Sequence, residues 1–335
     1  MITGAAGFIG AALCERLLKK EDNRYRIIGL DNLNDYYDIR LKEYRLDRLK
    51  GYEGFTFLKR DISDGGAVED IFNEYEPDIV VNLAAQAGVR ASITYPQLYI
   101  QSNLIGFFNI LEACRHHTDK LQQLIFASSS SVYGDSDEEL LSTDQMTDKP
   151  VSLYAATKKA DEVMGYSYSK LYGINMTGLR FFTVYGPAGR PDMAYYKFTD
   201  RISSGRKIEL YNYGKSFRDF TYVDDITDGI IRIIESDGNK GMDVPYRIMN
   251  IGRGRTVALE DFVRILFDGM KEEGLIGSDV SLSDCVEYLP PQPGDVLRTR
   301  RDVGPMRERY GYRPKTDLED GLMEFLKWYK EYNRK

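Results

Sequence analysis

Cysteine and histidine are both scarce in this chain. The 335 residues include three cysteines, Cys14, Cys114 and Cys285, which are widely spaced and form no C-x-x-C pair. This pattern indicates neither a disulfide framework nor a zinc site, and it fits a reducing compartment. The two histidines, His116 and His117, are neighbours, and adjacent side chains on a helix point to different faces. We therefore expect no metal site, no histidine-dependent triad and a cytoplasmic location.

Long apolar segments and an excess of basic charge are also lacking. The sequence has no apolar run of 18 residues and no charged leader followed by an apolar stretch, so we expect it neither to span nor to cross a membrane. Acidic residues outnumber basic ones by 52 to 45, which disfavours nucleic acid as a partner. A hydrophobic content of 42% is ordinary for a globular chain long enough for about two domains.

Apolar runs alternate with helical patterns in the first half of the chain. Strands are predicted at residues 26–30, 55–58, 79–83 and 124–127, and helices at residues 8–20, 68–74, 99–116 and 152–172. Such alternation predicts an α/β, doubly wound parallel sheet of the Rossmann type, with helices on both faces. Only Met1 and Ile2 precede the first turn, so the first strand is either unusually short or lacks residues upstream.

The pattern loosens after residue 180, where glycine and proline become frequent. We predict a cofactor-binding Rossmann domain over residues 1–180 and a smaller C-terminal α/β substrate domain over residues 181–335. Segments near residues 220–252, with a helix at 227–234 and a strand at 247–251, are expected to return to the first domain. Apolar residues at helical spacing also predict a helix over residues 317–332.

A glycine-rich turn precedes the first predicted helix. Gly4, Gly7 and Gly10 have G-x-x-G-x-x-G spacing, which lets backbone N–H groups approach a pyrophosphate. Asp31 follows 21 residues after Gly10, placed to accept hydrogen bonds from the adenosine ribose. A carboxylate there repels a 2′-phosphate, and the next residue is Asn32 rather than Arg, so NAD is favoured over NADP. The alternative is a glycine turn that closes a strand–helix unit without a ligand.

A second set of polar residues follows the strand at 124–127. Tyr154 and Lys158 are four residues apart, which places the phenol and the ammonium on one helix face. A nearby cation favours the phenolate and makes it a usable base, although this spacing also occurs on exposed helix faces. Four serines, residues 128–131, lie at the carboxyl end of the strand, where open α/β sheets bind ligands. The alternative for the serines is a flexible polar turn.

These motifs resemble the extended short-chain dehydrogenase/reductases, and within them the nucleotide-sugar epimerases of the NAD-dependent epimerase/dehydratase family. The resemblance covers nearly the whole chain. Segments similar to the UDP-glucuronate 4-epimerase branch are residues 30–37, 83–90, 150–154, 180–187, 218–222 and 292–296. The resemblance implies a bound NAD that takes a hydride from C4 of the sugar, after which the 4-keto intermediate turns and is reduced on its other face.

The resemblance also implies the catalytic residues. Tyr154 removes the proton of the C4 hydroxyl, Lys158 supports the phenolate and holds the nicotinamide ribose, and Ser129 hydrogen-bonds the reacting oxygen. Ser130 and Ser131 are alternatives to Ser129, or they face a substrate carboxylate.

The reaction type follows from Ser130, Ser131 and Thr183. The two serines stand where related dehydratases and decarboxylases carry an acid, so elimination and decarboxylation lack their catalyst. Galactose-type epimerases resemble this chain but carry Asn at Thr183, whose hydroxyl is a candidate donor to a C6 carboxylate. The resemblance thus implies interconversion of UDP-glucuronate and UDP-galacturonate. Alternatives are a UDP-glucose/UDP-galactose 4-epimerase, a UDP-glucuronate decarboxylase and, from another class, a catalytically silent nucleotide-sugar binding module, which the Tyr154–Lys158 pair disfavours.

Two further sets of residues are implied by the same resemblance, and the chain is expected to form a homodimer. The cofactor set is Gly4, Gly7, Phe8, Ile9, Gly10, Asp31, Asn32, Asp61, Ile62, Leu83, Ala84, Ala85, Asn103, Tyr154 and Lys158. The substrate set is Gln86, Arg90, Ser130, Ser131, Thr183, Arg190, Phe198, Tyr211, Arg218 and Asp295. For the arginines the alternative is a surface salt bridge or a solvated side chain, and for Phe198 and Tyr211 it is the hydrophobic core.

Overall fold

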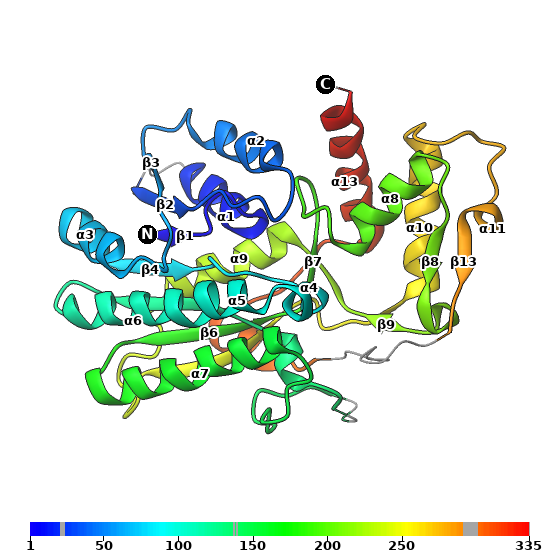
Figure 1. The fold of residues 1–335 in the computed structure, drawn as a ribbon. Coiled ribbons are helices and arrows are strands. Elements are labelled where there is room, and N and C mark those ends of the chain that lie inside the picture. Colours follow the sequence, from blue (N-terminus) through cyan, green and yellow to red (C-terminus); the bar gives the residue numbers. More distant parts are fainter. Residues whose placement is uncertain (21–23, 137, 139, 291–300, 335) are drawn as a thin grey trace.

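A seven-stranded parallel sheet forms the centre of the structure (Figure 1). The structure is a computed structural model that describes residues 1–20, 24–136, 138, 140–290 and 301–334. The strand order is β11-β6-β5-β4-β1-β2-β3. In chain order the strands are β1 Ile2–Thr3, β2 Ile27–Asp31, β3 Phe55–Lys59, β4 Ile79–Asn82, β5 Gln123–Ser129, β6 Met176–Phe181 and β11 Tyr246–Ile251.

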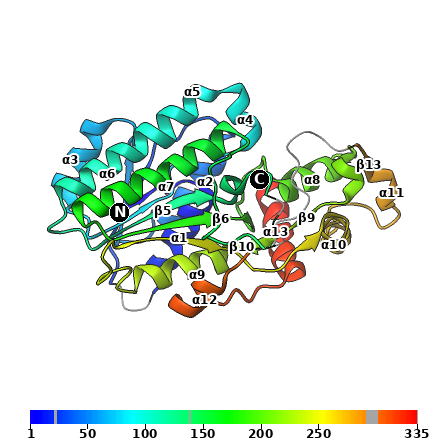
Figure 2. The same ribbon diagram turned by 90° about the horizontal axis from the view of Figure 1, so that it is seen from below.

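Helices cover both faces of this sheet (Figure 2). One layer contains α1 Phe8–Leu18, α2 Ile39–Leu49, α9 Val223–Ile234 and α12 Gly304–Tyr310. The other contains α3 Gly65–Tyr75, α4 Val89–Thr94, α5 Pro96–Tyr99, the π-helical η1 Ile100–Ile105, α6 Gly106–His116 and α7 Leu153–Tyr172. Buried apolar side chains fill both interfaces, among them Leu13 and Ile230 in one and Phe72 and Phe107 in the other. The prediction of a doubly wound α/β fold is confirmed.

A smaller lobe lies beyond the carboxyl ends of the strands (Figures 1 and 2). Its helices are α8 Ala194–Ser203, α10 Leu259–Glu272, α11 Leu282–Cys285 and α13 Leu318–Asn333. Three two-stranded sheets accompany them: β7 Thr183–Tyr185 with β10 Phe220–Tyr222, β9 Phe217–Arg218 with β12 Val257–Ala258, and β8 Ile208–Leu210 with β13 Val286–Tyr288. Along the chain, α9 and β11 lie between β10 and β12, yet α9 packs on α1 and β11 pairs with β6 of the central sheet. The division of the chain near residue 180 stays a prediction.

The predicted helix over residues 99–116 is wrong in one respect. Its first part is the π-helix η1, which has wider turns than an α-helix and separates α5 from α6. A side-chain contact accompanies the wider turns. The amide of Asn103 accepts a hydrogen bond from the Gln86 N–H at 2.8 Å and donates to the Gln86 carbonyl at 3.1 Å. Asn103 also donates to Thr157 in α7. The segment therefore holds the chain that follows β4.

Helix α2 has no counterpart among the predicted helices. Its buried residues are Leu41, Lys42, Arg45, Leu46 and Leu49, so charged side chains interrupt the apolar stripe by which a helix is recognised. Both charged groups find partners inside the protein: Arg45 donates to the carbonyls of Ala6 and Ala188, and Lys42 donates to Asn34.

In the described part of the chain, no helix is both long and apolar enough to cross a membrane.

A buried ion pair ties α7 to the two strands beside it. Arg180 of β6 donates to both carboxylate oxygens of Glu162 in α7, at 2.8 and 2.9 Å. Ser128 of β5 donates to the same carboxylate at 2.7 Å, and the guanidinium lies over the ring of Tyr133 at 4.7 Å. Both charged side chains are nearly inaccessible, at 3% and 4% exposure. The carboxyl end of β5 and the helix α7 are thus held together by charge-assisted hydrogen bonds.

Removing the carboxylate leaves the arginine charge buried and uncompensated. We therefore expect Glu162→Ala to lower the free energy of unfolding by about 3–5 kcal/mol. Urea denaturation followed by circular dichroism measures this. Glu324→Ala is the control, because its ion pair with Lys327 is exposed, and the expected loss there is below about 1 kcal/mol. Equal losses in the two variants would contradict the interpretation.

Candidate active site

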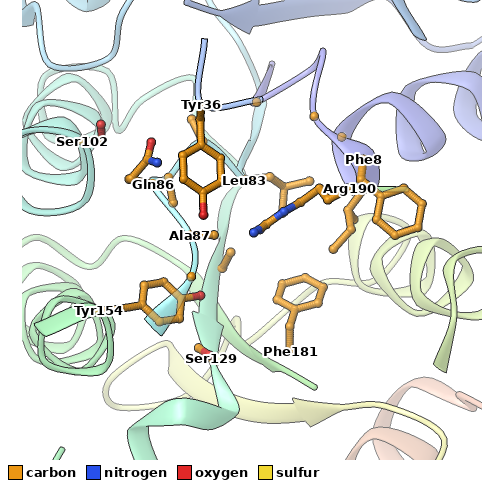
Figure 3. Close-up of a pocket in the computed structure, with 18 of the residues that line it drawn as sticks. Phe8, Tyr36, Leu83, Gln86, Ala87, Ser102, Ser129, Tyr154, Phe181 and Arg190 are labelled. Carbon is orange, nitrogen blue, oxygen red and sulfur yellow. The ribbon is translucent and has the colours of Figure 1, made fainter. Parts of the chain in front are cut away.

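A cavity of about 480 Å³ opens at the carboxyl ends of the central strands. It is lined by the turn after β1, by the chain after β2, β4 and β5, by the start of α7 and by the segment from Phe181 to Met193. Parallel α/β sheets place their ligands at this edge. Figure 3 shows side chains from these elements converging on one space.

The glycine turn packs too closely for larger residues. Gly4 has φ +69°, and a Cβ on it would lie 2.9 Å from the nitrogen of Ala84. A Cβ on Gly10 would lie 2.1 Å from the Gly4 oxygen, so the turn rests directly on the first turn of α1. Gly7 at the N-cap provides no side-chain hydrogen bond to the helix. The first N–H groups of α1 therefore remain suited to a pyrophosphate, and these features fit the diphosphate of NAD.

Asp31 lies at the end of β2, where the adenosine ribose of such a cofactor would bind. One carboxylate oxygen accepts from the Ala6 N–H at 3.2 Å and the other from the Leu33 N–H at 2.9 Å. The Lys42 ammonium is 3.7 Å from the carboxylate, and both side chains are buried. Burial lowers the pKa of Lys42, whereas the charge of Asp31 opposes that shift. Asn32 donates to Asp61 at 2.8 Å.

Tyr154 and Lys158 lie one turn apart near the start of α7. Ser152 caps this helix by accepting from the Ala155 N–H at 3.1 Å. The Lys158 ammonium donates to the carbonyl of Ala127 in β5 at 2.9 Å. Tyr154 points its hydroxyl into the cavity, toward Ser129 (Figure 3). The arrangement brings a phenol, a cation and a serine hydroxyl to one side of the cavity.

Ser129 lies at the last position of β5, and its hydroxyl accepts from the Ser131 N–H at 3.1 Å. Its neighbour Ser128 donates to Glu162 and so takes part in the buried ion pair. Ser129, Ser130 and Ser131 all line the cavity.

The opposite side of the cavity carries Arg190. Its guanidinium points into the space that Tyr36 and Tyr154 also face (Figure 3). The arginine donates to Asp192, with a distance of 2.9 Å from Nε, and lies 5.9 Å from the centre of the Tyr36 ring. Burial alone would lower the pKa of Arg190, but hydrogen bonding and the charge of Asp192 outweigh it and raise the pKa. The guanidinium is therefore charged in the working pH range. Thr183 lines the same cavity.

Most residues predicted for the site do line this cavity. They are Gly4, Gly7, Phe8, Ile9, Gly10, Asp31, Asn32, Asp61, Ile62, Leu83, Ala84, Ala85, Gln86, Ser129, Ser130, Ser131, Tyr154, Lys158, Thr183 and Arg190. Their functional roles stay predictions.

Five of the predicted residues that the structure describes are not among those that line the cavity. Asn103 is buried and bonded to the chain after β4, as described above. Arg90 lies over the ring of Tyr211 at 5.5 Å, and Tyr211 donates to Glu209. Phe198 packs against the core of the smaller lobe, and Arg218 is a half-buried residue of β9. Asp295 lies outside the described residues.

Several lining residues were not predicted as site residues, among them Tyr36, Lys42, Ser102, Asp192 and Met193. Lys42 had no local signal, since a lysine in a charged helix is normally solvent-exposed. For Tyr36 the sequence did offer a signal, because it lies in residues 30–37, one of the segments that resemble the family.

Among the described residues, no group of three histidine, cysteine, aspartate or glutamate side chains is placed to hold a metal ion.

The fold, the glycine turn and the Tyr154–Lys158 pair define a dinucleotide-dependent enzyme of the doubly wound α/β class. The chain belongs to the NAD-dependent epimerase/dehydratase family, whose family model matches residues 1–252. It is an NAD-dependent epimerase.

Individual relatives cover almost the whole chain. Protein CapI of Staphylococcus aureus is 44% identical and matches 100% of this chain and 99% of its own length. UDP-glucuronate 4-epimerase 4 of Arabidopsis thaliana is 40% identical over 99% of this chain and 75% of the relative. The crystal structure of UDP-glucuronic acid 4-epimerase from Bacillus cereus, in complex with UDP-glucuronic acid and NAD, superposes with a TM-score of 0.87 at 31% identity and covers 99% of this chain and 98% of that one.

Replacing Asp31, the carboxylate predicted to bind the adenosine ribose, tests the cofactor site. We expect Asp31→Arg to weaken NAD binding by roughly ten- to a hundredfold and to admit NADP, because a guanidinium attracts the 2′-phosphate. Isothermal titration with each cofactor measures this. Asp47→Arg in the same region, at an exposed position of α2, is the control and should leave both affinities unchanged. An unaltered preference for NAD would mean that another residue reads the ribose.

Proposed function

We propose that this enzyme interconverts UDP-glucuronate and UDP-galacturonate by reversible epimerisation at C4. The supporting observation is the cavity itself, where the Arg190 guanidinium and Thr183 stand in one space with Tyr154 and Ser129. A neutral hexose presents no charge to the half-buried Arg190 guanidinium, whereas a uronate presents a C6 carboxylate. Relatives named as UDP-glucuronate 4-epimerases support the same substrate.

The chemistry at C4 is assigned to α7 and the end of β5. Bound NAD would supply the acceptor, and afterwards the donor, of the hydride at C4. Tyr154 takes the proton of the C4 hydroxyl and returns one after the sugar has turned. Lys158 favours the phenolate by its charge and donates to the nicotinamide ribose. Ser129 donates to the reacting oxygen and holds it at the phenol. Asp31 and the N–H groups of the glycine turn orient the cofactor.

The C6 carboxylate is assigned to Arg190 and Thr183. Asp192 takes Nε and one terminal nitrogen of the guanidinium, which leaves the other terminal nitrogen to donate to the substrate. The Thr183 hydroxyl supplies a second donor, and Ser130 or Ser131 a third. Charge-assisted hydrogen bonds of this kind fix the sugar while its ring turns.

Ser130 and Ser131 favour epimerisation over loss of a group from the oxidised sugar. Elimination or decarboxylation needs an acid or base beside the sugar, and this chain has Ser130 and Ser131 there. A hydroxyl with an ordinary acidity does neither task at neutral pH. The oxidised sugar is therefore expected to return to the alcohol without losing a group.

The nucleotide end of the substrate is assigned to the smaller lobe. We assign the diphosphate to Arg218, which lies on β9 next to β12, and Gln86 to the sugar. Phe198 and Tyr211 are proposed to flank the uracil. Arg90, which lies over the Tyr211 ring, is proposed to place a positive charge near the nucleotide. Asp295 is proposed for the uridine ribose from the family resemblance.

In the decisive experiment, the purified protein is incubated with UDP-glucuronate, without added reductant, and the products are identified by NMR. Appearance of UDP-galacturonate at an equilibrium mixture supports substrate and reaction together. If UDP-glucuronate is untouched while UDP-glucose becomes UDP-galactose, the assignment of Arg190 and Thr183 to a carboxylate fails. Loss of the carboxylate from the product would show a decarboxylase, and binding without turnover would show a binding module.

The role of Tyr154 gives a direct prediction. Tyr154→Phe removes the proton-transfer hydroxyl and keeps the ring, so we expect NAD to bind normally and turnover to fall by about a hundredfold or more. The NMR assay measures turnover, and isothermal titration measures binding. Tyr172→Phe is the matched control, since it changes an exposed tyrosine at the far end of the same helix. Near-normal turnover in Tyr154→Phe would remove this residue from the mechanism.

We also propose a homodimer, formed through the outer surface of α4 to α7. Apolar side chains are exposed there on adjacent helices, including Ile93, Leu98, Phe108, Val163 and Tyr166. Figure 2 shows α6 and α7 side by side in the outer layer. Ile93 of α4 is 76% exposed and Val163 of α7 58%, and several large apolar residues exposed on helices that contact each other are typical of an interaction surface. Pairing with the same surface of a second copy would bury both patches.

Light scattering after gel filtration tests the dimer, with an expected mass twice that of one chain. Val163→Glu places a charge in the proposed interface and is expected to give monomers. Tyr288→Glu is the control, because Tyr288 is similarly exposed but lies on β13 in the smaller lobe. A parent protein that runs as a monomer would overturn this part of the proposal.

A further inference from the structure

A buried carboxylate lies directly beside the ammonium of Lys158. Asp161, three residues further along α7, accepts from Lys158 Nζ at 3.1 Å. The two side chains are 2% and 3% exposed. The Ala127 carbonyl takes a second N–H of the ammonium. Since an ammonium has three N–H groups, these two contacts leave one to point toward the cavity that Lys158 lines.

The surroundings of Asp161 are unusual for a purely structural ion pair. Its other carboxylate oxygen is buried and has no hydrogen-bond partner among the described residues. Burial raises the pKa of Asp161 to about 7, with a smaller contribution from the charge of Glu162, and the Lys158 ammonium opposes the shift. A half-satisfied carboxylate in such a site costs stability. Because Asp161 lowers stability, its position next to the proposed catalytic lysine indicates a role in the function of that lysine.

Other charged and titratable groups face this region from neighbouring elements. Glu162 is held by Arg180 and Ser128, so its charge is already compensated. Tyr246 of β11 lies near both carboxylates and donates to the Glu162 carbonyl at 2.7 Å. On the cavity side, the ring of Tyr99 stands edge-on to Tyr154 at 6.1 Å, and the charge of Arg190 acts on the same space. Among these described groups, Asp161 is the carboxylate in contact with Lys158.

We propose that Asp161 is a positioning residue for the catalytic pair: it holds the Lys158 ammonium and offsets part of its charge, and so sets how readily Tyr154 gives up its proton. The proposal rests on the roles proposed above for Tyr154 and Lys158. With Asp161 protonated, the full charge of Lys158 acts on the phenol. With Asp161 ionised, the net charge beside the phenol is smaller, and the phenolate forms at a higher pH.

The test compares the parent protein with Asp161→Asn. An asparagine keeps an oxygen that accepts from Lys158 but carries no charge. We expect Tyr154 to ionise at a pH lower by on the order of half a unit to one unit. The ultraviolet difference between each protein and its Tyr154→Phe counterpart isolates this tyrosine from the other phenols and requires no substrate. The acid limb of the pH profile of kcat should move in the same direction.

Asp148→Asn is the matched control, because Asp148 is an exposed carboxylate that pairs with Lys159 of the same helix. It removes an equal charge nearby and should leave the Tyr154 titration unchanged. An unshifted titration in folded, NAD-binding Asp161→Asn would overturn the proposal, since a structural role alone does not require the shift. If Asp161→Asn does not fold, Asp161→Ser is measured in the same way.

A measurement on the parent protein decides the question if neither variant folds. The carboxyl carbon resonance of Asp161 reports its ionisation directly. A carboxyl that stays protonated up to about pH 9 carries no charge to offset Lys158 and overturns the proposal, and ionisation near neutral pH supports it. Failure of the proposed substrate is a separate outcome: UDP-glucuronate would then be unchanged in the NMR assay, whereas the Tyr154 titration would still shift in Asp161→Asn.

Discussion

The contact between Glu162 and Arg180 is the one on which the active site depends. It joins α7 to β6 and, through Ser128, to the end of β5. These are the elements that carry Tyr154, Lys158 and Ser129, so the pair holds the proposed base and the proposed hydrogen-bond donor at a fixed separation. The bonds are charge-assisted and shielded from water, where electrostatic interactions are strong. Proton transfer needs such a fixed geometry, because it works only within hydrogen-bond reach.

Two buried carboxylates, each in an ion pair, thus lie next to each other on α7: Asp161 pairs with Lys158 and Glu162 with Arg180 of β6. Glu162 is fully engaged with Arg180 and contributes rigidity. Among the described residues, Asp161 is bonded through one oxygen only, to Lys158, which lines the cavity. The same helix therefore carries a structural carboxylate on one side and a carboxylate coupled to the proposed chemistry on the other. Across the cavity, Arg190 and Asp192 form a third pair, whose charge suits an anionic sugar.

Sequence patterns predicted the strands and helices whose buried faces are apolar. The strands and helices of the first half alternate clearly, because a strand buried on both faces is apolar throughout and its covering helix is amphipathic. Helix α2 was missed because Lys42 and Arg45 face inward. The π-helical η1 was missed because its wide turn accompanies the contact between Asn103 and Gln86, which are far apart in the sequence. Local periodicity contains no information on such contacts.

By itself the sequence determined the class of fold, the glycine turn, the position of Asp31 after the second strand and the Tyr154–Lys158 pair, since each depends on spacing within one short segment. Tertiary structure decided which of the distant residues meet. It placed Arg190, Thr183 and Tyr36 in the lining of the cavity and buried Lys42 beside Asp31. Asn103, Phe198 and Arg218, which were also predicted for the site, are not part of that lining. It also isolated Asp161 with Lys158, because β5 and β11 pack against α7 and exclude water from that side. The electrostatics of a site depend on burial, and burial is a property of the packed chain.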